Sequence, residues 1–115
     1  MINIIENTLR DGSYVIDFQF TKEQTFKVVT ELEEMGFEYI EVGHGLGLGA
    51  YNNPKCGFSA ENDEVYIQTA REAAKNAKVV SFFIPGIGTV EDIRIAKSNG
   101  LDFIRCGINI NDFRK

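Results

Sequence analysis

Short apolar runs alternate with amphipathic segments along the chain, and this alternation limits most strongly the folds open to it. Four runs have the composition of buried strands, at residues 2–9, 37–42, 78–84 and 101–106. The segments between them repeat apolar residues at helical spacing. Strands that alternate with helices in this way predict an α/β fold, in which the strands form a parallel sheet with right-handed crossovers.

The three predicted helices begin at residues whose side chains are suited to capping. Thr21 opens the first helix with capping-box spacing, and Gly36 ends it. Ser59 or Asn62 caps the second helix, and Thr89 opens the third. The chain therefore reads as about four strands and three helices.

Two parallel architectures accommodate this order of elements. One is a small doubly wound sheet, and the other is a (β/α)8 barrel. A complete barrel takes eight strands and about 250 residues. We expect the 115 residues to form one domain, 1–115, which holds about half of the strands and residues of a complete barrel. A barrel-derived chain of this length would be a partial barrel with exposed strand edges.

An arginine and an aspartate stand at the end of the first predicted strand. Arg10 and Asp11 follow the run at residues 2–9, and we expect Gly12 to end the strand because glycine adopts backbone angles that other residues resist. Ligands of parallel α/β folds bind at the carboxyl ends of strands. A guanidinium there suits an oxyanion, and a carboxylate suits a hard cation. The alternative is a surface ion pair.

A glycine-rich loop at residues 43–59 follows the second predicted strand. Loops of this length in compact domains are usually functional or disordered. His44 in this loop is either a site residue or a solvent-facing histidine. Glu41, which ends the strand, is either a partner of site residues or an exposed acid. Arg105 on the fourth strand either pairs with an acid in the sheet interior or is a strand-end cation.

Composition excludes several classes of function. The formal net charge is -5 with dispersed acids, which argues against a nucleic-acid partner. No apolar run approaches the roughly 18 residues of a membrane span, and no signal-peptide pattern opens the chain. We therefore expect a cytoplasmic protein without a membrane partner. Cys56 and Cys106 form no metal-binding pattern, which favours reduced thiols.

Five motifs carry a resemblance to a known family. Residues 8–12 (TLRDG) resemble metal-dependent lyases and synthases that share a (β/α)8 barrel, such as 3-hydroxy-3-methylglutaryl-CoA lyase and isopropylmalate synthase. The match narrows to the 4-hydroxy-2-oxovalerate aldolases at residues 19–21 (QFT), 40–45 (IEVGHG), 47–49 (GLG) and 85–90 (PGIGTV). The resemblance implies the N-terminal half of a TIM barrel.

The resemblance also implies an activity and a set of site residues. The reaction of the aldolases is the cleavage of a 4-hydroxy-2-keto acid to pyruvate and an aldehyde, and it uses a divalent metal, Mn2+ or Mg2+. By resemblance, Asp11 is a metal ligand, Arg10 binds the substrate and stabilises the enolate, and His44 and Gly45 line the site. Tyr14 stands where the aldolases have a histidine base. An ordinary tyrosine is a poor base at neutral pH, because its pKa is about 10.

The family's paired metal-binding histidines lie on a later barrel strand, and His44 is the only histidine of this chain. With the imidazole ligands missing, we expect the 115 residues alone to be catalytically incompetent. The resemblance further implies a small keto-acid substrate and an acylating aldehyde dehydrogenase partner. Two alternatives stay open: a non-catalytic half-barrel that forms homo-oligomers through its strand edges, and a related acyl-CoA lyase or synthase.

Overall fold

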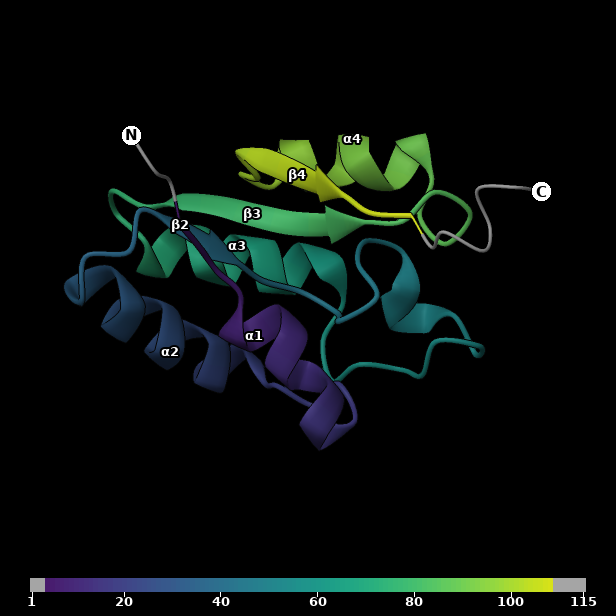
Figure 1. Cartoon of the computed structure of the whole chain (residues 1–115), viewed down its shortest axis with the longest axis horizontal. Helices are drawn as coiled ribbons and strands as arrows, with labels where there is room; N and C mark the ends of the chain where they lie inside the picture. The colour runs from purple at the N-terminus through teal and green to yellow at the C-terminus, as the bar shows by residue number, and fades with distance from the viewer. Residues whose placement is uncertain (1–3, 109–115) are drawn as a thin grey trace.

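A computed structural model describes residues 4–108, in which parallel strands alternate with helices (Figure 1). The strands are β1 (Ile5–Glu6), β2 (Tyr39–Glu41), β3 (Lys78–Phe83) and β4 (Phe103–Cys106). The helices are α1 (Thr8–Asp11), α2 (Lys22–Glu34), α3 (Asp63–Ala73) and α4 (Val90–Ser98). Two 3-10 segments, Gly12–Ile16 and Ala50–Asn52, lie in the connections. Within this described part, no helix combines the length and apolar character that a bilayer crossing requires.

The strands pair in sequential order, β1-β2-β3-β4, and all three pairings are parallel. Sequential order is that of a barrel arc, whereas a doubly wound sheet reverses direction at a switch point. The predicted α/β fold of half-barrel type is therefore confirmed, and the doubly wound alternative is wrong.

The core lies between the sheet and its helices. Val29 of α2 and Ala70 of α3 pack with Ile40 and Val79 of the central strands, and all four are buried. A second cluster, which includes Phe83 and Ala96, joins β3 to α3 and α4. On the described sheet, an open hollow of about 370 Å³ is lined by Ile5, Tyr39, Val80, Phe103, Ile104 and Arg105.

The helix starts follow the sequence. Thr21 and Thr89 each form a capping box. The threonine hydroxyl accepts a hydrogen bond from the N–H of the third helical residue, and the side chain of that residue accepts one from the threonine N–H. Asn62, rather than Ser59, caps α3, since its side chain accepts from Val65 N–H at 2.8 Å. Gly36 ends α2 with a φ of 96°, a conformation that favours glycine.

The strand predicted at residues 2–9 is wrong at its carboxyl end. β1 stops at Glu6, and the chain turns into α1 at once. The cause is local: both oxygens of the Glu6 carboxylate accept hydrogen bonds from Thr8, one from its N–H at 2.6 Å and one from its hydroxyl at 2.9 Å. Gly12 has a φ of -66°, so its left-handed freedom is not used. Residues 2 and 3 of that prediction lie outside the described residues.

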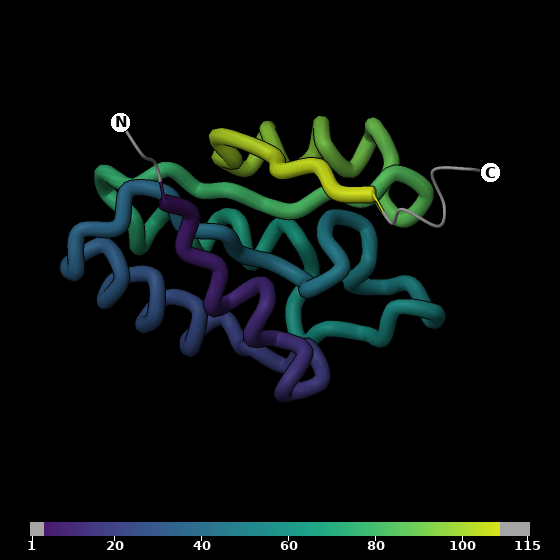
Figure 2. Tube along the Cα trace, in the orientation of Figure 1, coloured from purple at the N-terminus to yellow at the C-terminus, as the bar shows by residue number. Residues whose placement is uncertain are grey.

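The long segment at 43–62 leaves the sheet at the carboxyl end of β2 before α3 returns along it (Figure 2). The turn α1 lies at the carboxyl end of β1, so Arg10 and Asp11 are carried to the same end of the sheet. The fold therefore brings the first motif and the glycine-rich loop together.

Candidate active site

Glu41, the last residue of β2, is the centre of a polar cluster at the carboxyl end of the sheet. Its side chain is 0% exposed. Its Oε1 accepts hydrogen bonds from Arg10 Nε at 2.7 Å and from Arg105 Nη2 at 2.9 Å, and its Oε2 accepts from Arg105 Nε at 2.8 Å. One carboxylate thus joins α1, β2 and β4.

Phe82 of β3 completes this cluster. The guanidinium carbons of Arg10 and Arg105 each lie 4.6 Å from the centroid of its ring, within the range of a cation–π interaction. Arg10 Nη1 also donates to the carbonyl of Gly45 at 3.1 Å. Arg10, Glu41, Phe82 and Arg105 are called the Arg–Glu–Arg cluster below.

The charges of the Arg–Glu–Arg cluster do not cancel, because two guanidiniums share one carboxylate. Burial by itself raises the pKa of Glu41, but the hydrogen bonds from Arg105 and Arg10 outweigh it, so that pKa lies below its usual range. Glu41 is therefore ionised at neutral pH, and the cluster carries a net positive charge. Asp11 is only a weak counter-ion: its carboxylate is 67% exposed and 3.9 Å from Arg10 Nη1.

Tyr14 and Gly45 lie beside Arg10. A Cβ atom on Gly45 would come within 2.6 Å of Tyr14 Cε2, so the absence of a side chain lets the phenol ring lie on the loop. The Tyr14 ring also makes an edge contact with Phe18, with 5.2 Å between centroids. Burial raises the pKa of Tyr14, and the positive charge of Arg10 only partly opposes this. The phenol therefore keeps its proton at neutral pH.

His44 is buried, and both of its ring nitrogens are bonded to main chain. Nε2 lies 2.8 Å from the carbonyl of Gly57, and Nδ1 accepts from Leu46 N–H at 2.9 Å. A carbonyl can only accept, so the proton is on Nε2 and the ring is neutral. Burial lowers the pKa of His44, and the bond to Gly57 only partly offsets this. The ring also stacks on Phe18, with 3.8 Å between centroids.

The structure thus brings four predicted residues together: Arg10, Asp11, Tyr14 and Gly45. It places His44 in the same loop as Gly45, but both ring nitrogens of His44 are bonded to main-chain atoms of that loop. The interior pairing considered for Arg105, and the partner role considered for Glu41, are both present. Phe82 was missed. Its signal in the sequence is the period of two along β3, which places it on the same face as Val80.

The described residues do not by themselves fit a divalent metal ion. Residues 4–108 hold no group of three or more histidine, cysteine or acidic side chains that could bind one. Both oxygens of Glu41 are taken by guanidiniums, and Asp11 is a single exposed carboxylate. Hard cations take about six oxygen ligands, water molecules included, and Asp11 supplies one exposed carboxylate to that number.

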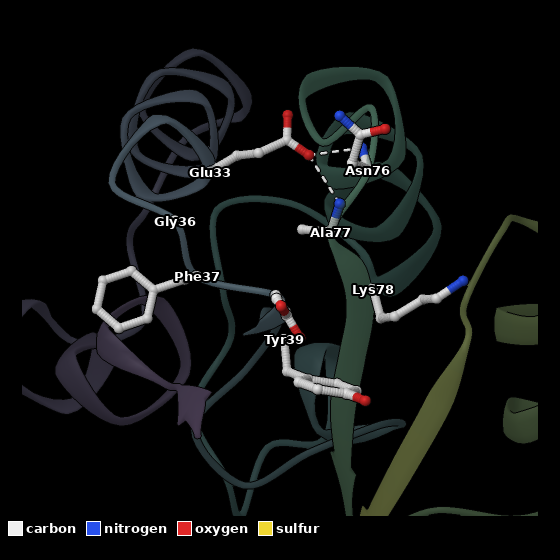
Figure 3. Close-up of a pocket in the computed structure, with 8 residues that line it drawn as sticks. Glu33, Gly36, Phe37, Tyr39, Asn76, Ala77 and Lys78 are labelled. Carbon is white, nitrogen blue, oxygen red and sulfur yellow. Dashed lines mark hydrogen bonds between the residues drawn. The ribbon is translucent and has the colours of Figure 1, made fainter. Parts of the chain in front are cut away.

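A different hollow, of about 380 Å³, lies at the amino ends of β2 and β3 (Figure 3). Glu33 lies at its rim, and its carboxylate accepts main-chain N–H bonds from Asn76 and Ala77, at 2.6 and 2.7 Å, and from Lys75 at 3.0 Å. These bonds join the end of α2 to the turn before β3. We assign this end of the sheet to stability, because the groups that bond Glu33 are main-chain N–H groups that fix the end of α2 to the turn before β3.

The sequential parallel sheet, with charged side chains at its carboxyl end, defines a protein of the (β/α)-barrel class. The HMGL-like family model matches residues 1–115, and the chain belongs to that family.

Named relatives agree with this assignment. The 4-hydroxy-2-oxovalerate aldolase of Moorella thermoacetica is 40% identical over 111 residues, which are 96% of this chain and 32% of the relative. The enzyme of the same name from Bacillus cereus has the same identity and coverage. The oxaloacetate decarboxylase of Mycobacterium tuberculosis is 34% identical over 110 residues, again 96% and 32%. The chain spans about a third of the length of these relatives.

Proposed function

We propose that this chain forms the N-terminal part of a lyase that breaks a carbon–carbon bond of a small 2-oxo acid, by aldol cleavage of a 4-hydroxy-2-oxo acid to pyruvate and an aldehyde. The supporting observation is the net positive Arg–Glu–Arg cluster at the carboxyl end of the sheet. A 2-oxo acid is an anion, and it gains a second negative oxygen when the bond breaks.

The names of the relatives point to one common intermediate. In 4-hydroxy-2-oxovalerate, the bond between C3 and C4 breaks, its electron pair moves to C3, and the hydroxyl proton leaves as the aldehyde forms. In oxaloacetate, the equivalent bond breaks and CO2 leaves. Both reactions produce the enolate of pyruvate, which then takes a proton at C3. A site for either reaction must therefore stabilise negative charge at the former keto oxygen.

Arg10 is the residue to which we give that task. Its Nε is fixed by Glu41 and its Nη1 by the carbonyl of Gly45. A donor held in this way needs no reorganisation when charge develops, which makes its stabilisation effective. Gly45 would line the substrate site through its main chain.

Aldol cleavage also requires a base that accepts the proton of the substrate hydroxyl. Tyr14 holds its proton at neutral pH, so it suits a hydrogen-bond donor better than a base. A catalytic role of His44 stays a prediction, and to act as a base the ring would have to give up its bond to Leu46 N–H or Gly57.

This favours a second candidate function, the decarboxylation of a 2-oxo diacid such as oxaloacetate. Decarboxylation forms the same enolate but needs no base, because no hydroxyl proton has to be removed. The raised pKa of Tyr14 and the bonded ring of His44 are compatible with it.

We also propose that a divalent ion, Mn2+ or Mg2+, acts with this site and takes one carboxylate oxygen from Asp11. Its other protein ligands would come from outside residues 4–108. On this view the 115 residues do not turn over substrate alone. Release of pyruvate by this chain with Mn2+, well above the rate of buffer with Mn2+, would contradict this expectation.

A fusion tests the main proposal. The chain would be joined to the part of the Moorella thermoacetica aldolase that it does not match, and pyruvate release would be followed with 4-hydroxy-2-oxovalerate and with oxaloacetate. We expect release from at least one substrate, and loss of about a hundredfold or more in kcat with Arg10→Gln, since one oxyanion donor is removed. Arg94, which is exposed on α4, provides the matched control Arg94→Gln. A folded fusion whose turnover is equal with and without Arg10 would refute the role of this cluster.

The two substrates separate the two candidates. Release from 4-hydroxy-2-oxovalerate favours the aldolase, and release from oxaloacetate alone favours the decarboxylase. An aldehyde product would also need a consuming reaction, so an acylating aldehyde dehydrogenase stays the predicted partner. Association through the edges β1 and β4 is a separate prediction, which light scattering at several concentrations tests.

A further inference from the structure

Arg105 makes more specific contacts than an ordinary ion pair at the end of a strand requires. It donates two hydrogen bonds to Glu41, one to each carboxylate oxygen, whereas Arg10 donates one. A guanidinium that binds both oxygens fixes the plane of the carboxylate, because the two planar groups must align. Arg105 therefore determines where Glu41 Oε1 points, and Oε1 is the atom that holds Arg10 Nε.

Phe82 connects the same two arginines by a second route, since both guanidiniums lie against its ring. The ring lies against Gly107, which follows β4. A Cβ atom on Gly107 would clash with Phe82 Cζ and come within 2.8 Å of Cε1. The lack of a side chain after β4 thus leaves room for the ring at the place where both cations contact it.

We propose that Arg105 is a positioning residue, which acts through Glu41 and Phe82 to hold Arg10 in one orientation toward the substrate. The consequence for the reaction rests on the proposed function, but the geometry stands without it. Arg10 uses Nε on Glu41 and Nη1 on the carbonyl of Gly45, and the Tyr14 phenol also lies within reach of its guanidinium. A fixed Arg10 therefore holds its positive charge in one place for an anion.

A purely structural role for Arg105 predicts something different. In that case Arg105 would only fasten β4 to β2, and any cation that neutralises Glu41 would do the same. Lysine is such a cation, but it is a point charge that cannot bind both oxygens in one plane. Arg105→Lys therefore separates the two roles, since it keeps the charge and removes the fork.

The first measurement uses this chain and the NMR signal of the Arg10 Nε–H group. We expect a slowly exchanging, shifted signal in the unchanged chain. Arg105→Lys should move it toward the position of a free arginine and speed its exchange, while thermal unfolding shows that the variant is folded. Gly107→Ala should do the same by displacing Phe82. Arg94→Gln is the control and should leave the signal unchanged. An Arg10 signal that is unaffected in both folded variants overturns the positioning role.

The second measurement uses the fusion described above. A misplaced Arg10 should lower kcat by about a hundredfold in Arg105→Lys, as small errors in geometry do. KM should change by about threefold or less, because the loss falls on the transition state. If Arg105→Lys moves the Arg10 signal but leaves kcat unchanged, the geometry holds and the role proposed for Arg10 in the reaction fails. If kcat is lost while the Arg10 signal is unchanged, the positioning role is refuted.

Discussion

Each end of the sheet holds a carboxylate that accepts three hydrogen bonds, but the donors differ between the two ends. At the amino end, Glu33 accepts three main-chain N–H groups. At the carboxyl end, Glu41 accepts three N–H groups from two guanidiniums. Both carboxyls have a lowered pKa. Main-chain donors bring no charge, so they do not neutralise Glu33, whereas two guanidiniums outnumber the one charge of Glu41 and leave its site positive. A positive surplus can bind an anion.

A third carboxylate extends the comparison. Asp63, the first residue of α3, is 6% exposed, and its Oδ2 accepts a hydrogen bond from Gly49 N–H at 2.8 Å. Its Oδ1 is buried without a partner among the described residues. Burial raises the pKa of Asp63 to about 6, despite the bond from Gly49, and the nearby charge of Asp92 adds to this. Burial by itself raises the pKa of a carboxyl, and the number and charge of the donors decide whether that pKa ends above or below its ordinary value.

Glu41→Gln should have the largest effect. The substitution removes the charge that both guanidiniums share and leaves Arg10 buried with only the weak counter-ion Asp11, which costs about 3–5 kcal/mol of unfolding free energy. The pKa of Glu41 is lowered, so this stabilisation is present above the unfolded value of 4.5 and is lost as the pH falls through the folded value. Urea unfolding at pH 7 measures the effect.

The control for this prediction is Glu91→Gln. Glu91 is 68% exposed and pairs with Arg94 at 3.7 Å, so its loss should change stability by about 0.5 kcal/mol or less. Equal losses of unfolding free energy in the two variants would show that the Arg–Glu–Arg cluster stabilises the fold no more than an exposed ion pair does.

Asp63→Asn should stabilise the protein at neutral pH. The carboxyl has a pKa of about 6 in the folded chain against 3.8 as its ordinary value, which corresponds to about 3 kcal/mol. Because the folded value is raised, ionisation opposes folding, and the stability of the unchanged chain falls as the pH rises from about 4 to above 6. The gain from asparagine should therefore be largest at pH 7 and vanish near pH 4.

Unfolding curves of Asp63→Asn at several pH values test this. Glu64→Gln, at the exposed neighbour, is the control and should shift stability by about 0.5 kcal/mol or less. A variant less stable than the unchanged chain at pH 7 would mean that the Asp63 carboxylate is needed in its charged form.

Glu33→Gln should have the smallest effect of the three. The amide keeps one acceptor oxygen for Asn76 and Ala77 but loses the bond from Lys75 N–H, a cost of about 1–2 kcal/mol. Hydrogen bonds from Ala77 and Asn76 lower the pKa of Glu33, so the difference from the unchanged chain should be present above pH 4.5 and shrink as the pH falls below it.

Thermal unfolding of Glu33→Gln is compared with that of Glu34→Gln, which alters the adjacent exposed acid. Turnover of the fusion should be unchanged in both. Loss of activity in Glu33→Gln would place functional chemistry at the amino end and remove the contrast between the ends.

Local patterns in the sequence were sufficient for much of the fold. The capping boxes at Thr21 and Thr89 depend on residues three positions apart, so they can be seen in the sequence. The turn α1 could not be predicted from the sequence, because it depends on the conformation of the Glu6 side chain. The hydrogen bonds of His44 could not be predicted either, since its partner Gly57 is 13 residues away in an irregular loop.

The sequence by itself determined the alternation of strands and helices, the family, and the presence of Arg10 and Asp11 shortly after the first strand. Only the tertiary structure decided the balance of charge there. Glu41 and Arg105 are 64 positions apart, and parallel strands bring them within 2.8 Å. Whether a carboxylate is raised or lowered in pKa depends on how many donors reach it after folding, and those donors come from elements that no local pattern connects.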